Sequence, residues 1–184
     1  MQNPLRSWLL LVLIGTIWGS SFILMKKGLV VFEDTQIAAV RMGLAWLVTL
    51  PFLLGRFKEI SKKEWLILLS VGLLGNGVPA FLFATAQTQI DSSLTGMLNS
   101  LVPILTMVFG LLLFGLRTWF LQVIGLIIGF VGALLLIVMP DGIDGFKPHA
   151  LLVVLASMCY AFNLNMVRKY LSKMPSILIT AGSF

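Results

Sequence analysis

The sequence is poor in charge, histidine and cysteine, and each shortage excludes a class of protein. Only 11% of its 184 residues are charged, whereas about a quarter are charged in soluble domains. One histidine and seven scattered carboxylates form no cluster for catalysis or metal binding, so we expect no enzyme, no metal and no cofactor. The single cysteine, Cys159, excludes an internal disulfide. Despite a net charge of +6, basic and aromatic residues are not interleaved, so we expect no nucleic acid partner.

The sequence is rich in apolar residues, which make up 59% of the chain and give a mean hydropathy of +1.03. A water-soluble fold could not bury this much apolar surface, whereas a bilayer protein presents its outer faces to lipid. We therefore predict an all-α, polytopic helical membrane protein whose surroundings are the lipid bilayer.

Long apolar segments divide the chain into expected membrane spans, each needing roughly 20 residues. Six spans and part of a seventh are predicted, at residues 8–27, 35–54, 65–88, 94–114, 119–139, 149–167 and 175–184. Within the third, Gly75-Asn76-Gly77-Val78-Pro79 predicts an interruption, because proline removes a backbone donor and clashes with the preceding turn.

The basic residues predict the orientation of the chain. Twelve of them lie outside the spans or at their ends, and they divide nine to three between the two sides of the membrane. Such an excess marks the cytoplasmic side, so we expect a cytoplasmic N-terminus in the cytoplasmic membrane. The larger group is Arg6, Arg56, Lys58, Lys62, Lys63, Arg117, Arg168, Lys169 and Lys173, and the smaller is Lys26, Lys27 and Lys147.

The first apolar stretch returns late in the chain at an offset of 142 residues. This offset aligns Trp18 with Tyr160 and the basic pair Lys26-Lys27 with Arg168-Lys169. Two leucine-rich helices can match by chance, but the shared basic end favours a repeat. Five spans separate the copies, so the second crosses the membrane in the opposite direction. Inverted repeats are typical of secondary transporters, whose substrate site lies near the midplane between the copies.

Arg41 is the one charged residue well inside a span. Placing arginine at a helix centre costs roughly 2.5–3.5 kcal/mol on the insertion scale. One interpretation is a contact with a substrate anion or a gating contact. The other, which we favour from the sequence, is a structural arginine paired with Glu33 or Asp34 two turns away.

Polar side chains in the third and fourth spans are candidates for a substrate path. Asn76, Pro79 and Gln87 share one face of the third span. A proline-broken helix is typical of transporter sites, although an ordinary packed kink explains it equally well. In the fourth span, Asn99 and Pro103 lie on a polar face that predicts either cavity lining or helix–helix hydrogen bonding.

The two copies of the repeat supply the remaining candidates. Trp18 is unusual in mid-span, and with Ser21 beside it, it forms either a flat wall for a substrate or part of the core. Tyr160 and Asn163 share a face, and Asn165 points nearly opposite, so at most one of these asparagines is expected to line a cavity.

Several motifs together resemble the EamA-like permeases of the drug/metabolite transporter superfamily. The resemblance lies in their order and spacing over nearly the whole chain: Trp18-Gly-Ser-Ser-Phe22 with Lys26, Ala38-Ala-Val-Arg41-Met, Gly75-Asn-Gly-Val-Pro79, Asp91-Ser-Ser-Leu-Thr-Gly-Met-Leu-Asn-Ser-Leu-Val-Pro103 and Gly125-Leu-Ile-Ile-Gly129-Phe-Val-Gly132. It implies ten spans in two inverted five-helix repeats, with 1–139 the first and 140–184 the start of the second. It also implies a path between the repeats for small metabolites, amino acids, nucleotide sugars or drugs, and central roles for Trp18, Arg41, Asn76, Asn99 and Pro103.

Two departures from the family pattern shape the functional expectation. Leu116 stands where the family commonly has an acidic residue, and residue 184 corresponds to Met42 of the first copy. We therefore expect an incomplete carrier, an exporter of small metabolites, amino acids or drugs. The alternative is a non-transporting membrane subunit that acts in assembly or interaction. If the chain stops at residue 184, a transport pathway would have to be completed by a homodimer. The predicted substrate-binding residues are Trp18, Ser21, Arg41, Asn76, Gln87, Asn99, Pro103, Tyr160 and Asn163.

Overall fold

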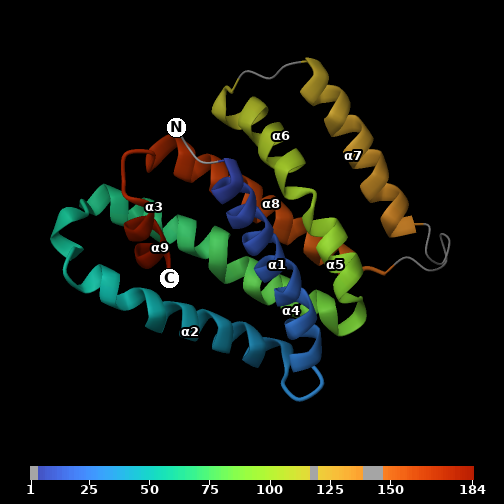
Figure 1. The fold of residues 1–184 in the computed structure, drawn as a ribbon, viewed down its shortest axis with the longest axis horizontal. Coiled ribbons are helices and arrows are strands. Elements are labelled where there is room, and N and C mark those ends of the chain that lie inside the picture. The colour runs from blue at the N-terminus through green and yellow to red at the C-terminus, as the bar shows by residue number, and fades with distance from the viewer. Residues whose placement is uncertain (1–3, 117–119, 139–146) are drawn as a thin grey trace.

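The computed structural model describes residues 4–116, 120–138 and 147–184, and these residues are helical apart from short links (Figure 1). The elements in chain order are α1 (Pro4–Gly28), α2 (Asp34–Leu54), the 3-10 turn η1 (Phe57–Glu59), α3 (Lys62–Gly72), the π-turn η2 (Leu73–Gly77), α4 (Val78–Gln89), α5 (Ser92–Asn99), α6 (Val102–Phe114), α7 (Phe120–Val138), α8 (His149–Tyr170) and α9 (Ser176–Ser183).

Five helical segments are long and apolar enough to cross a membrane. They are Leu5–Gly28, Asp34–Leu54, Lys62–Gln89, Ser92–Phe114 and His149–Tyr170, in the order predicted. The helix α7 lies in the fifth expected span, and α9 begins the incomplete seventh. The prediction of an all-α, polytopic membrane protein is confirmed. The link 140–148 between the fifth and sixth spans lies mostly outside the described residues.

The third span contains the predicted interruption, as a change in helix type rather than a break. Between α3 and α4, η2 widens to π geometry, and the Val78 N–H donates to the Leu73 carbonyl. Pro79 follows at the start of α4. Proline has no N–H to continue the α-helical hydrogen-bond pattern. The π-turn accommodates this, so the helical segment runs without a break from Lys62 to Gln89.

The fourth span contains a break that the sequence prediction missed. The helix α5 ends at Asn99 and α6 begins at Val102. Between them the Ser100 N–H donates a hydrogen bond to the Met97 carbonyl, and the Leu101 N–H donates to the Leu98 carbonyl, three residues back in each case. Pro103 occupies the first turn of α6, where its missing N–H is tolerated. A continuous α-helix would need that N–H to satisfy the Asn99 carbonyl, so Pro103 explains the break.

The bundle centres on α4 and α8, with α6 against the other side of α8 (Figure 1). The helix α9 packs on α2 and α3, α1 packs on α4 and α5, and α7 lies at the edge of the bundle. Alanines at 80, 84 and 86 on α4 and at 150 and 156 on α8 are buried and let these helices approach closely. Leu98 and Val153 fill the core beside them. The outward faces stay apolar, as lipid allows.

Helix boundaries in the two stretches related by the 142-residue offset coincide. The helix α1 ends at Gly28 and α8 ends at Tyr170, 142 residues later. In the same way α2 begins at Asp34 and α9 begins at Ser176. The register that aligns the basic pairs in the sequence therefore also aligns the helix ends in the structure.

Candidate functional site

An aromatic–arginine cluster forms where four helices meet, and it consists of Phe22, Met25, Arg41, Phe83 and Tyr160. The Phe83 ring, only 2% exposed, lies between the other two rings. Its centroid is 5.5 Å from that of Phe22 and 5.7 Å from that of Tyr160. Arg41 Nη1 lies 3.8 Å from Met25 Sδ, and its charge lies within electrostatic range of the Tyr160 hydroxyl.

The helices bring this cluster together at one depth. Thr85 Oγ1 donates to Asp34 Oδ2, which ties the start of α2 to the end of α4. Arg41 lies seven residues after the start of α2, and Phe83 lies six residues before the end of α4. At 1.5 Å per residue both are about 10 Å from the same end of the bundle. A cation and flat apolar rings therefore lie side by side within the span.

Arg41 does not form the ion pair that we favoured from the sequence. Glu33 forms a capping box with Gln36, and Asp34 accepts from the Thr35 N–H at 2.8 Å as well as from Thr85. Both carboxylates satisfy groups at the start of α2, where the helix dipole also favours negative charge. Among the described residues, the single ion pair within 4 Å joins Arg56 and Glu59 at the surface.

A second group of polar residues, the amide cluster, surrounds the π-turn: Gly75, Asn76, Asn163 and Ser183. Asn76 Nδ2 lies 3.3 Å from both the carbonyl and the Oγ of Ser183, so Asn76 holds α9 against the third span. The Asn163 amide lies on Gly75, where an added Cβ would be 2.1 Å from Asn163 Nδ2. Asn163 Oδ1 has no partner among the described residues. This cluster is about 20 Å from the C-terminal end of α4, whereas the level of Arg41 is about 10 Å from that end.

The other predicted residues lie outside both clusters. Trp18 is 69% exposed, because α1 diverges from the bundle toward its N-terminus, and Phe22 one turn later makes the ring contact instead. Pro103 is exposed, and Ser21 and Asn99 are half-buried. Gln87 is fully buried near the end of α4, and neither atom of its amide has a partner in the described part of the chain.

Two polar residues have structural roles that the sequence did not reveal. Asn165 is 2% exposed, and its Nδ2 donates to the carbonyls of Thr106 at 2.9 Å and Ala161 at 3.0 Å, which joins α8 to α6. Lys26 Nζ donates to the carbonyls of Gln87 at 2.7 Å and Ile90 at 2.9 Å. Lys26 therefore caps the C-terminus of α4, a role that only the packing of α1 on α4 could reveal.

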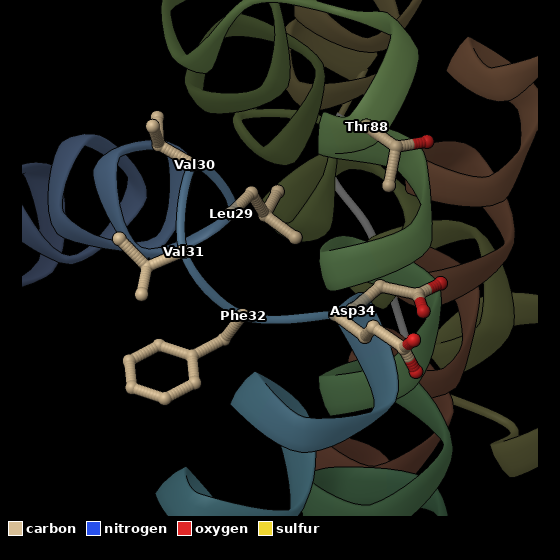
Figure 2. A pocket seen from close by; sticks show the side chains of 7 residues that line it. Leu29, Val30, Val31, Phe32, Asp34 and Thr88 are labelled. Atoms are coloured by element: carbon tan, nitrogen blue, oxygen red, sulfur yellow. The ribbon is translucent and has the colours of Figure 1, made fainter.

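An open hollow of about 430 Å³ lies at the link between α1 and α2, apart from both clusters. Leu29, Val30, Val31, Phe32, Glu33, Asp34 and Thr88 line it. Figure 2 shows Asp34 and Thr88 at one side of the hollow and Val30 and Val31 at the other. None of the predicted binding residues lines this hollow, so it is not the candidate site. Among the described residues, no three potential metal ligands gather anywhere.

Comparison with known proteins gives the chain a family. The EamA-like transporter family model matches residues 6–138. An uncharacterized transporter of Archaeoglobus fulgidus is 26% identical over 133 residues, which is 72% of this chain and 48% of that protein. The uncharacterized inner membrane transporter YedA of Escherichia coli K12 is 28% identical over 148 residues, 79% of this chain and 48% of YedA. No solved structure matches the chain.

The chain spans about half the length of these curated relatives. The family match covers α1 to α7, and with them every helix of the aromatic–arginine cluster except α8. The resemblance seen in the motifs is thus confirmed over most of the sequence: the chain belongs to the EamA-like transporter family.

Proposed function

We propose that this chain acts in a membrane carrier that exports small metabolites, amino acids or drugs. The observation that supports it best is the make-up of the aromatic–arginine cluster. Three of its helices, α1, α2 and α4, belong to the predicted first repeat, and α8 belongs to the predicted second. A site shared between two repeats is the arrangement expected of a secondary transporter.

The proposed mechanism is alternating access by rocking of the second repeat, which holds α8 and α9, against the first, which holds α1 to α7. The helix ends that coincide at the 142-residue offset support an inverted repeat. The amide cluster lies on the same boundary, since Asn76 of the first repeat contacts Ser183 of the second. The proposed setting is the inner membrane with a cytoplasmic N-terminus, in keeping with the distribution of basic residues and the name of YedA.

A transport assay with a matched pair of tyrosine variants tests the function. The chain is reconstituted in proteoliposomes, and counterflow of a panel of labelled amino acids, organic acids and drug-like cations is measured. We expect Tyr160→Leu to reduce counterflow of the accepted compound at least tenfold, because it removes one wall of the cluster. Tyr170→Leu, at an exposed tyrosine at the end of α8, is expected to leave it unchanged.

Two outcomes would contradict the proposal. A folded protein that moves no compound of the panel would favour the non-transporting subunit. Equal counterflow in Tyr160→Leu and the wild type would remove the aromatic–arginine cluster from the path.

A further inference from the structure

The Arg41 guanidinium has no counter-charge among the described residues. In the described part of the chain no carboxylate lies within 4 Å of it, and Nη1 lies 3.8 Å from the Met25 thioether. Charged groups inside a membrane span are normally paired or face water, because the hydrocarbon does not solvate them. Arg41 therefore remains electrostatically uncompensated within an otherwise apolar level of the bundle.

The carboxylates nearest in sequence are not available to compensate it. Asp34 is occupied by the Thr85 hydroxyl and the Thr35 N–H, and Glu33 by its capping box. Glu64 accepts from Ser61 at the start of α3, at the opposite end of the bundle from the start of α2. Glu59 pairs with Arg56, and Asp91 forms no ion pair with Arg41. Because no carboxylate of the described residues binds Arg41, the guanidinium can accept the negative charge of a ligand.

The surroundings of Arg41 indicate the rest of that ligand. The arginine side chain is exposed, so that a ligand has access to it. Beside it, Phe83 and Tyr160 are stacked with 29° between the ring planes, and the Phe22 ring lies at 58° to that of Phe83. Phe83 is enclosed between the two other rings, whereas Tyr160 is only partly buried. The Tyr160 ring therefore offers an apolar surface, which favours an aromatic or other planar body.

We propose that the aromatic–arginine cluster binds a small organic carboxylate, with its negative group on Arg41 and its planar body against Tyr160. Guanidinium and carboxylate match in a two-bond geometry that lysine does not reproduce. The cluster holds no carboxylate to pair with an ammonium group, so monoanions bind better than zwitterionic amino acids or cations. This specificity rests on the proposed function, because the ligand is taken to be the transported substrate.

Ligand-induced thermal stabilisation of the purified full chain in neutral phosphatidylcholine nanodiscs tests the binding. The probes are phenylacetate, its neutral isostere phenylacetamide, and the cation phenethylamine. We expect phenylacetate alone to raise the melting temperature. In Arg41→Gln its apparent Kd is expected to rise roughly 10- to 150-fold, the loss that corresponds to one charge-assisted hydrogen-bonded contact. Arg168→Gln, an exposed arginine at the end of α8, serves as the matched control and retains binding.

Additional measurements separate effects on folding and effects of lipid from ligand binding. The melting temperature without ligand shows whether Arg41→Gln folds, and Arg41→Lys is expected to bind with an intermediate Kd. Equal stabilisation by phenylacetamide, or an unchanged Kd in Arg41→Gln, would overturn the proposal. A third outcome would also overturn it: added anionic lipid stabilises the wild type but not Arg41→Gln, and phenylacetate stabilises neither. The counter-charge of Arg41 would then be a lipid headgroup.

Counterflow of labelled phenylacetate separates this inference from the proposed function. Binding without counterflow would retain the carboxylate site and refute the carrier. Counterflow of neutral or cationic compounds that is equal in Arg41→Gln and the wild type would retain the carrier and refute the carboxylate site.

Discussion

The contact between the π-turn and α8 leads to a quantitative prediction about Gly75. A Cβ added there would lie 2.1 Å from Asn163 Nδ2 and 2.6 Å from Asn163 Cγ. Ordinary contacts of a Cβ begin near 3.4 Å, so α8 would have to move by about 1 Å or Asn163 would have to leave its position. Because α8 packs against α4 and η2 on one side and α6 on the other, either adjustment costs free energy.

The expected magnitude follows from two opposing effects. Overpacking a tight interface costs about 1–3 kcal/mol. Replacing glycine by alanine in a helix gains up to about 1 kcal/mol. The 2.1 Å approach places the overpacking cost at the upper end of its range, so Gly75→Ala should lower the free energy of unfolding by about 2 kcal/mol. In a chain of this length each kcal/mol lowers the melting temperature by about 2–4 °C.

A double mutant isolates the contact itself. Asn163→Ala removes the three atoms nearest to the new methyl group, so Gly75→Ala in that background should recover roughly 1–3 kcal/mol. Gly43→Ala, at an exposed position on α2 where a Cβ meets nothing within 4 Å, is the control and should be neutral or slightly stabilising. The comparison uses melting temperatures in one detergent, followed by tryptophan fluorescence, of the wild type, the two single mutants, the double mutant and Gly43→Ala. An equal loss with and without Asn163 would refute the steric explanation.

Three further substitutions test the contacts between helices. Lys26→Met should lower the melting temperature by about 2–4 °C, because the carbonyls at the end of α4 lose their donor, and Lys27→Met, at an exposed neighbour, should not. Asn165→Leu should destabilise by about 0.6–2 kcal/mol in detergent unfolding, since it removes the hydrogen bond from α8 to α6, and an unchanged stability would show that this bond contributes nothing. Thr85→Val should cost about 1 kcal/mol by releasing Asp34, measured against exposed Thr88→Val, and equal effects of the two would contradict that role.

The sequence predicted the positions of the spans well, because hydropathy over roughly 20 residues is a local property. The sixth span, expected at 149–167, is observed as α8 from His149 to Tyr170. Pro79 correctly marked a disturbance in the third span, since a proline lacks its N–H in any tertiary context. Pro103 has the same chemistry, yet its break was missed, because Asn99 and Pro103 were assigned to one face of a continuous helix. Family membership, too, was predicted from the order of the motifs.

Side-chain partners, by contrast, were decided by the rotation and crossing of helices distant in the sequence. Asn76 contacts Ser183, 107 residues away, and Lys26 caps a helix that ends more than 60 residues later. No local pattern distinguishes Asn165, which joins two helices, from Asn163, whose Oδ1 has no partner in the described structure. The sequence by itself determined which segments are long and apolar enough to span a membrane. It also showed that one charged residue, Arg41, lies well inside such a segment and needs a partner. The tertiary structure alone decided that Asp34 and Glu33 do not provide it, because both are held at the start of α2.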